Sequence, residues 1–431
     1  MIRKFLYCWL GYWLLVLLLP VHSLFPAVGE AFLLQVGFVL MVLVGYFSAS
    51  PQLREVAMPG ISMGDLGDAR FIVRASLWMS LLGFACLLID KVFIQHIDYS
   101  SGLAFAREQW RLLGEEREGK ASSIWSILGY VFGSAYYVTL VAVFVQPHRF
   151  TNAQRAGALG ATFIFALANS VITGGRSNFL LIAAVAVSAL AARRGLGLRQ
   201  VFASRRQRRY IAVILCAALA YIMYVFYSRA QAGNVLVYLY VVNFMPYMGL
   251  EMDTWYQQVM TEGFIGAAAN LVVITLGYLS HSFSTTAAII DAPLEHKMIL
   301  FSNFGGILYK FGLVDQPQTD WFLAGRFPSV PGALWHQFGL LGAIVVPYLL
   351  GLAGALATQW ARQRPNRLLP LGAYVLISTT LLLTPFIFAP DLLAFPSVVV
   401  AFVLLAGLSR LRRHLVALTA PQPNPQMRAI P

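Results

Sequence analysis

The sequence is poor in charged residues and in cysteine. Only 11% of its 431 residues are Asp, Glu, Lys or Arg and 59% are hydrophobic, whereas a soluble domain carries about 25% charged residues. So much apolar surface does not fit in one water-soluble core, which excludes an ordinary soluble protein. The three cysteines, Cys8, Cys86 and Cys216, all lie in apolar runs without a CxxC spacing. Neither a disulfide framework nor a zinc site is therefore indicated.

The short motifs of several enzyme classes are also missing. The sequence contains no HExxH, no GxSxG, no paired-aspartate metal motif and no P-loop. A metalloprotease, a lipase-type serine hydrolase and a P-loop ATPase are therefore unsupported, and no metal or other cofactor is expected. The formal net charge of +13 is explained by the arginine excess of short cytoplasmic loops. No nucleic-acid partner is needed to explain it.

What the chain does have is a series of apolar runs, and a helix crosses a bilayer with roughly 20 apolar residues. The runs predict an all-α, polytopic membrane helix bundle of about ten transmembrane helices, with residues 1–431 forming a single membrane domain. The predicted spans are residues 5–24, 27–47, 73–94, 122–145, 156–173, 178–192, 210–228, 332–358, 368–388 and 391–409. The first run resembles a signal peptide, but no clear cleavage site follows it, so we interpret it as an uncleaved helix.

Basic residues predict which side of the membrane each loop faces. The densest basic stretch, residues 193–209, should stay in the cytoplasm. Counting spans from it also places the N-terminus and the loops with Arg149, Arg364 and Arg410 in the cytoplasm, so four separate clusters agree with one orientation. Both termini are therefore expected to be cytoplasmic, with residues 415–431 as a disordered tail.

The largest loop, residues 229–331, falls on the external side. It contains apolar stretches at residues 235–250, 264–279 and 298–314, with prolines, glycines and a glutamate among or beside them. If an odd number of these stretches crossed the membrane, the basic C-terminal tail would lie outside. Only an even number of them can therefore cross. We expect short helices on or in the outer leaflet, and twelve spans if two of them cross.

Three external arginines depart from the cytoplasmic bias and are candidates for the functional site. Arg176 lies in the tight turn of residues 173–178, whose two glycines permit positive φ and bring backbone amides close to a ligand. Arg229 follows the end of a span. Arg326 lies in the Pro- and Gly-rich segment 325–332 that leads into the next span. Each position also has a purely structural interpretation, as a tight turn, a helix end or a helix start.

Planar guanidinium groups bridge phosphate oxygens. Three of them on one outer face suit a lipid-linked pyrophosphate better than a free metabolite. We therefore hypothesise that Arg176, Arg229 and Arg326 converge in one external cavity.

The same region supplies candidates for catalysis and sugar binding. His281, in a Ser-His-Ser sequence, and His336, early in the next span, are the preferred general bases, ahead of the loop carboxylates. A lone histidine at such a position is more often a hydrogen-bonded structural residue. Trp255, Trp321 and Trp335 offer faces for sugar rings, although interfacial tryptophan also occurs for lipid reasons alone.

At these residues the chain resembles the Wzy-type O-antigen polymerases, or oligosaccharide repeat-unit polymerases, of bacterial envelopes. The resemblance rests on the Gly-Gly-Arg-Ser turn at residues 174–177, the large external loop, and the GRFPSVPG and FGLLG sequences at residues 325–332 and 338–342. It covers nearly the whole chain in architecture, but its local motifs cover only about 30 residues.

The resemblance implies a membrane glycosyltransferase of the bacterial inner (cytoplasmic) membrane that needs no cofactor. Such an enzyme polymerises undecaprenyl-pyrophosphate-linked repeat units at the periplasmic face, with membrane lipids around it and a chain-length regulator as a further partner. The three arginines would then stabilise the departing diphosphate, with Arg176 also counted among the catalytic residues beside His281 and His336.

Three other functions stay open at this stage. An O-antigen ligase shares the architecture but transfers the finished glycan to lipid A core. A carrier or flippase of lipid-linked sugars requires charged residues buried within its spans, and the sequence shows few of these. A membrane scaffold without chemistry would tolerate the loss of Arg176 and Arg326.

Overall fold

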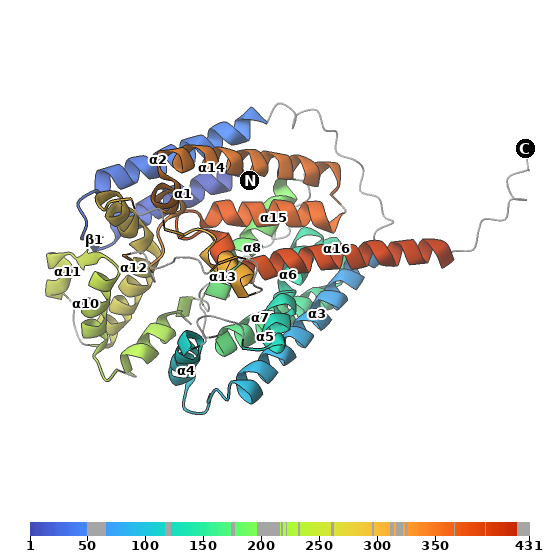
Figure 1. Cartoon of the computed structure of the whole chain (residues 1–431), viewed down its shortest axis with the longest axis horizontal. Helices are drawn as coiled ribbons and strands as arrows, with labels where there is room; N and C mark the ends of the chain where they lie inside the picture. The colour runs from blue at the N-terminus through green and yellow to red at the C-terminus, as the bar shows by residue number, and fades with distance from the viewer. Residues whose placement is uncertain are drawn as a thin grey trace, which may run out of the picture.

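Helices dominate the computed structural model of the chain (Figure 1). The structure describes residues 1–49, 66–116, 122–173, 177–195, 216, 219–220, 222–231, 233–259, 263–294, 297–310, 314–315, 322–323, 326–365, 367–392 and 394–419.

The first half of the described chain forms eight α-helices and one short strand. They are α1 (Ile2–Leu18), β1 (Val21–Ser23), α2 (Val28–Ser48), α3 (Leu66–Leu88), which continues as a π-helix at Ile89–Ile94, α4 (Leu103–Glu116), α5 (Ile124–Gly133), α6 (Tyr136–Val145), a 3₁₀ turn at Pro147–Arg149, α7 (Asn152–Thr173) and α8 (Ser177–Gly195).

The second half continues with helices and a second short strand. Residues 222–231 are helical, and they are followed by α10 (Val237–Tyr247), β2 (Leu250–Met252), α11 (Thr254–Val259), α12 (Phe264–Asp291), α13 (Ser302–Lys310), α14 (Val330–Gln363), α15 (Leu368–Leu383), a 3₁₀ turn at Ala389–Asp391 and α16 (Ala394–Thr419). Helix α16 thus extends to residue 419, past the start of the tail expected at residue 415, and residues 420–431 lie outside the described chain.

Seven helical segments of the described chain are long and apolar enough to cross a membrane. They are Val28–Ser48, Asp68–Ile94, Ile124–Val145, Asn152–Ile172, Ile265–Asp291, Val330–Gln363 and Ala394–Val416. The protein is therefore a polytopic membrane protein with about seven apolar spans, and a count of ten is not shown. Two further predicted spans are the shorter apolar helices Leu180–Ala192 and Leu368–Leu383.

Two other predicted spans also differ from the structure. Helix α1 ends at Leu18 because Pro20 follows, and the residue before a proline is driven out of the helical conformation. Of the predicted span 210–228, nine residues lie outside the described chain, and residues 222–228 are helical.

Helix α12 is the main departure from the expected surface helices of the large loop. It is one continuous helix of 28 residues, and most of it qualifies as a membrane span. The apolar run ends at residue 279, but the helix continues because four of the five hydroxyl groups in residues 280–286 find hydrogen-bond partners inside the bundle, for example Ser282 with Pro385 O and Thr286 with Ser329. Burial of satisfied hydroxyl groups costs little.

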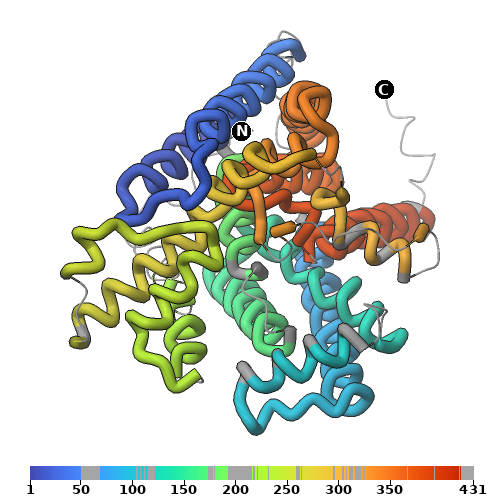
Figure 2. The backbone as a smooth tube through the Cα atoms, turned by 60° about the vertical axis from the view of Figure 1, so that its left-hand side comes forward, coloured from blue at the N-terminus to red at the C-terminus, as the bar shows by residue number. Residues whose placement is uncertain are grey.

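A two-stranded antiparallel sheet is the one exception to the all-α expectation among the described residues. Strand β1, between α1 and α2, pairs with β2, between α10 and α11, with Val21 opposite Met252. The pairing ties the loop that begins at residue 229 to the N-terminal helices. Figure 2 shows the segment from α10 to α12 beside α1 and α2, which are far from it in sequence.

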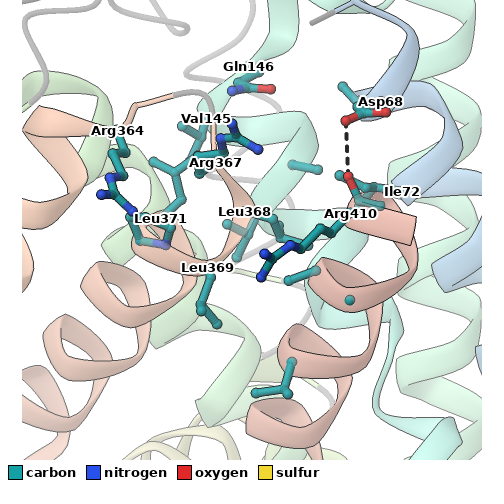
Figure 3. A pocket seen from close by; sticks show the side chains of 18 of the residues that line it. Asp68, Ile72, Val145, Gln146, Arg364, Arg367, Leu368, Leu369, Leu371 and Arg410 are labelled. Carbon is teal, nitrogen blue, oxygen red and sulfur yellow. Dashed lines mark hydrogen bonds between the residues drawn. The ribbon is translucent and has the colours of Figure 1, made fainter. Parts of the chain in front are cut away.

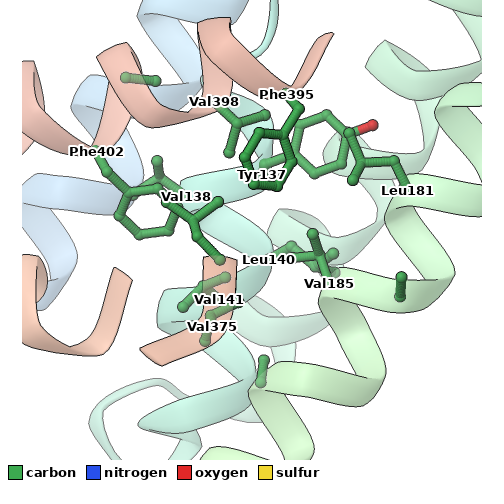
Figure 4. Close-up of a cluster of buried hydrophobic side chains, with 14 of the residues drawn as sticks. Tyr137, Val138, Leu140, Val141, Leu181, Val185, Val375, Phe395, Val398 and Phe402 are labelled. Atoms are coloured by element: carbon green, nitrogen blue, oxygen red, sulfur yellow. The ribbon is translucent and has the colours of Figure 1, made fainter. Parts of the chain in front are cut away.

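Helices α2 and α14 pack over the longest shared interface and lie side by side in Figure 1. A Cβ atom at Gly45 would collide with the backbone of Tyr348, and one at Gly351 would collide with the backbone of Val42. Small residues that let backbones approach are the usual means of helix association in membranes. A second core lies between α6, α8, α15 and α16, where Tyr137, among others, packs (Figure 4).

The two ends of α14 define two ends of the molecule. Arg326 precedes the first turn of α14, and Arg364 follows its last turn. The Sδ atom of Met1 packs beside Gly354, so the N-terminus lies toward the Arg364 end. The basic end of α16 is also there, because Arg410 and Arg364 line the same pocket. Arg364, Arg410 and the N-terminus thus lie toward one end of the molecule, while the side of the membrane that this end faces stays a prediction.

Candidate functional site

Two segments that contain predicted site residues, His281 in one and Arg326 in the other, meet in the structure. They are residues 280–286 of α12 and residues 326–332 at the start of α14. The Ser329 amide donates to the Ser282 carbonyl at 3.3 Å, and the Ser329 and Thr286 hydroxyl groups are 2.8 Å apart. Gly332 lies directly against the Thr286 side chain, so a larger residue does not fit there. The start of α14 is thus held on the face of α12.

His281 forms the outermost link between the two segments. Its ring is buried, with Nδ1 2.5 Å from the Tyr278 carbonyl oxygen and Nε2 3.3 Å from the Phe327 amide nitrogen. A carbonyl only accepts, so Nδ1 carries the proton, and Nε2 accepts from the Phe327 N–H. These bonds define one neutral tautomer. The lone pair that a base would use is occupied in this conformation.

Arg326, next to Phe327, is only partly buried. Its guanidinium lies over the Tyr247 ring, 5.3 Å from the centroid, a geometry in which a cation is attracted to the ring. Burial lowers the pKa of Arg326, and Tyr247 and Phe327 remain 52% and 40% exposed. A fixed cation therefore sits beside two accessible aromatic rings.

The segment that carries Arg229 packs on α10, the helix that also contains Tyr247. Arg229 is on the helical segment 222–231, whose Phe226 ring is 5.7 Å from the Phe244 ring of α10. The Phe244 ring in turn is 5.9 Å from the Tyr247 ring, over which the Arg326 guanidinium lies. The segments with Arg229 and Arg326 thus pack on the same helix. Arg176, the third member of the hypothesised cavity, lies outside the described residues.

The other predicted site residues have different surroundings. His336 is fully buried in α14, with its ring 6.4 Å from Phe322. Trp335 is partly buried and packs against the small cluster of Leu323 and its neighbours. Trp255 is 58% exposed and donates to Asp253 at 3.2 Å. Trp321 lies outside the described residues.

An exposed histidine between two carboxylates was missed by the sequence analysis. His22 Nδ1 is 2.9 Å from Asp253 and His22 Nε2 is 3.4 Å from Glu251, beside Trp255. The pairing of β1 with β2 brings these residues together across more than 200 positions of sequence, and no local pattern indicates it. Within the described residues, no cluster of His, Cys, Asp and Glu is suited to hold a metal ion.

A buried ion pair was also missed. Asp90 and Lys91 are 0% and 2% exposed, and their charged groups are 3.5 Å apart. Asp90 accepts from Ser122 and Gln95 at 2.5 Å each and from Ser123 at 2.6 Å, and Lys91 lies 4.7 Å from the Trp110 ring centroid. The visible signal was two adjacent charges inside an apolar run.

No family model, curated protein or solved structure matches this chain. The geometry therefore has to carry any functional assignment.

A pocket of about 670 Å³ lies at the opposite end of α14 from Arg326. It is formed by the ends of α3, α6, α14, α15 and α16, and its charged lining residues are Asp68, Arg149, Arg364, Arg367, Arg410 and Arg413. Figure 3 shows Arg364, Arg367 and Arg410 around it, with Asp68 at its far wall. The sequence analysis interpreted these arginines only as determinants of orientation.

Proposed function

We propose that this protein is a membrane glycosyltransferase that polymerises polyprenyl-pyrophosphate-linked oligosaccharide repeat units at the periplasmic face of the bacterial inner membrane. The observation that carries the proposal is the fixed Arg326 guanidinium beside exposed aromatic rings at one end of a helix bundle. A cation suits the diphosphate and an aromatic face suits a sugar ring. The resemblance to the repeat-unit polymerases supports the same assignment.

The reaction needs charge stabilisation at the leaving group. A sugar hydroxyl attacks the anomeric carbon of the donor, the bond from that carbon to the diphosphate oxygen breaks, and the diphosphate departs with the negative charge. Arg326 and Arg229 are assigned to this charge, together with Arg176. Because Arg326 is already oriented by Tyr247, little reorganisation is needed when the charge develops.

The attacking hydroxyl must lose its proton to a base. His281 and His336 are the candidates, as neutral imidazoles accept a proton. For His281 this requires the hydrogen bond from the Phe327 amide to open when substrate binds. In the closed geometry, His281 instead positions Arg326 by holding the neighbouring residue of the backbone. Trp255, the more exposed of the two predicted tryptophans that the structure describes, is assigned to a sugar ring.

The proposal is tested by glycan ladders from a deletion strain complemented with Arg326→Gln. We expect lipopolysaccharide capped with a single repeat unit, because the diphosphate loses its fixed cation. Arg326→Lys keeps the charge but loses the planar fork, and it should give shortened ladders. Arg70→Gln, which removes an exposed arginine of α3 away from the site, is the matched control and should give a full ladder.

The same strains separate the alternatives. If deletion leaves bare lipid A core, the protein is a ligase, and if Arg326→Gln gives a full ladder at normal expression, the assignment of Arg326 is wrong.

A carrier for lipid-linked sugars is the second candidate, favoured by the buried Asp90–Lys91 pair. It requires ionisable groups inside a span, and this pair lies in the last turns of the Asp68–Ile94 segment. Under this alternative, Asp90→Asn leaves unpolymerised lipid-linked repeat units on the cytoplasmic side. Under the polymerase proposal, those units reach the periplasmic side in the same variant.

A further inference from the structure

The arginine pocket at the end of α14 has a charge surplus that its own carboxylate does not balance. Asp68 is the one acidic residue that lines it within the described part of the chain. Ser409 donates to Asp68 Oδ2 at 3.0 Å, and Arg413 Nε is 3.2 Å from the same oxygen. Arg412 adds a weaker contact to the other oxygen at 3.9 Å. The carboxylate is therefore already neutralised by neighbours on α16.

Three other arginines of the pocket remain available to an anion. The side chains of Arg364, Arg367 and Arg410 form no ion pair with any described residue. They are exposed, yet Figure 3 shows them around one hollow, Arg364 and Arg367 from the α14–α15 connection and Arg410 from α16. Three unbalanced cations that line one pocket repel one another, and a bound anion relieves that repulsion.

The backbone around the pocket also favours a bound anion. Arg367 is the N-cap residue of α15, so the positive end of that helix points to the pocket, and helix N-termini bind phosphate groups. Gln146, 8% exposed, donates to the Pro365 carbonyl at 3.5 Å. This contact ties the turn with Arg364 and Arg367 to the end of α6. The α14–α15 connection, which carries Arg364 and Arg367, is thus anchored to α6.

The rest of the lining is apolar and continues onto the outer surface. Leu369 and Val403 line the pocket and are 40% and 54% exposed. Val403 belongs to a membrane span, so its exposed side faces lipid. A ligand with a phosphate and acyl chains can place the first among the arginines and the second along this wall.

We propose that this pocket binds the phosphate headgroup of an anionic phospholipid, with Arg364, Arg367 and Arg410 contacting the phosphate oxygens and the acyl chains lying along Leu369 and Val403. Basic pockets between spans are known to bind such headgroups. The site is independent of the proposed glycosyl transfer, because it lies at the other end of α14. It gives the arginines of this end a role beyond orientation.

The test measures binding of phosphatidylglycerol to the full-length protein in phosphatidylcholine nanodiscs and by native mass spectrometry. The triple variant Arg364→Gln, Arg367→Gln, Arg410→Gln should bind phosphatidylglycerol roughly tenfold or more weakly. The control triple Arg3→Gln, Arg70→Gln, Arg74→Gln removes three exposed arginines outside the pocket and should stay within about twofold.

A second variant keeps every charge. Gly407 lines the pocket, and a Cβ atom there meets nothing within 4 Å, so Gly407→Leu is expected to fold. Its side chain should occupy part of the pocket and weaken phosphatidylglycerol binding as the charge variant does. This variant decides the question if the triple arginine variant does not fold.

Three outcomes would overturn the proposal. One is wild-type binding in the pocket triple or in Gly407→Leu. The second is an equal loss in the control triple, which indicates general surface attraction. The third is saturation by inorganic phosphate or pyrophosphate in phosphatidylcholine at concentrations where phosphatidylglycerol also saturates, which indicates a soluble phosphate ligand.

Discussion

At the scale of single residues, Asp391 is the described carboxyl group outside the spans whose pKa departs most from its value in water. It ends the 3₁₀ turn between α15 and α16, and burial raises its pKa to about 7. Hydrogen bonds from the Phe301 and Ser302 amides partly oppose the shift. Since Ser302 begins α13, the carboxyl group joins the α13 helix to the α15–α16 connection.

Asp391 makes the stability of the protein depend on pH. In the unfolded chain the group ionises near pH 4, whereas in the folded chain it keeps its proton up to about pH 7. The folded state therefore binds more protons in this window, and the free energy of unfolding falls as pH rises from about 4 to about 7, then levels off. Asp391→Asn should flatten this slope in thermal unfolding of the detergent-solubilised protein.

Asp98 provides the control for that measurement. Hydrogen bonds from Ser100 and Ser101 lower its pKa to about 2, so its titration lies below the measured window. Asp98→Asn should leave the slope between about pH 5 and about pH 7 unchanged. An equal slope in Asp391→Asn and in the wild type would contradict the assignment to Asp391.

The residues of the candidate site could be predicted only in part. Proline and glycine around Arg326 and the isolated His281 marked two segments of the site, because such residues are unusual beside apolar runs. Their contact with each other, and the Tyr247 ring under Arg326, depend on how α10, α12 and α14 pack. The contact of His22 with Asp253, one of the loop carboxylates considered as a base, could not be predicted, because only the pairing of β1 with β2 joins them.

At the scale of helices, the contact between α2 and α14 depends on glycine. Gly45 and Gly351 face the backbone of the other helix so closely that a methyl group does not fit. In a membrane, packing contacts of this kind drive helix association, because lipid is as apolar as the side chains. The two helices therefore act as one unit that supports the start of α14 and, with it, Arg326.

Gly45→Ala is expected to destabilise the protein by about 1–3 kcal/mol, because the added methyl group overpacks the contact with Tyr348. Thermal unfolding in detergent measures the loss. Gly37→Ala is the matched control on the same helix, since a Cβ atom there meets nothing within 4 Å, and it should be neutral or slightly stabilising. Equal stability of the two variants would rule out the close approach of α2 and α14.

Helix boundaries could be predicted where hydropathy alone sets them. Helices α2, α7 and α14 coincide with long apolar runs, because a bilayer selects such runs whatever their neighbours. Helix α12 could not be predicted in full, because the polar residues 280–286 read as the end of a run until their partners on other helices are known. The shorter α15 was predicted, but its length leaves it below that of a full span.

At the scale of the whole molecule, the arginines divide between two ends. Arg364, Arg367 and Arg410 surround the pocket at one end, and Arg326 lies at the other. Helix α14 lies between them and is kinked at Gly339, where φ is 62° and ψ is -156°, and the straight segment after the kink, residues 340–363, is about 36 Å long. The hydrocarbon core of a bilayer is about 30 Å thick. The two groups of arginines must therefore face different compartments if α14 spans the membrane.

Cysteine labelling tests this arrangement in a variant whose three native cysteines are replaced by serine. With a membrane-impermeant maleimide, Phe327→Cys should react in intact spheroplasts, and Arg364→Cys should react only in inside-out vesicles, since the arginine-rich side is expected to be cytoplasmic. Arg3→Cys should behave like Arg364→Cys, because Met1 packs beside Gly354 toward the same end of α14. Labelling of Phe327→Cys and Arg364→Cys from the same side would show that α14 does not cross the membrane. If the accessibility of all three cysteines is reversed, the two ends of α14 still face different compartments, but the candidate glycan site faces the cytoplasm. That result would contradict polymerisation at the periplasmic face.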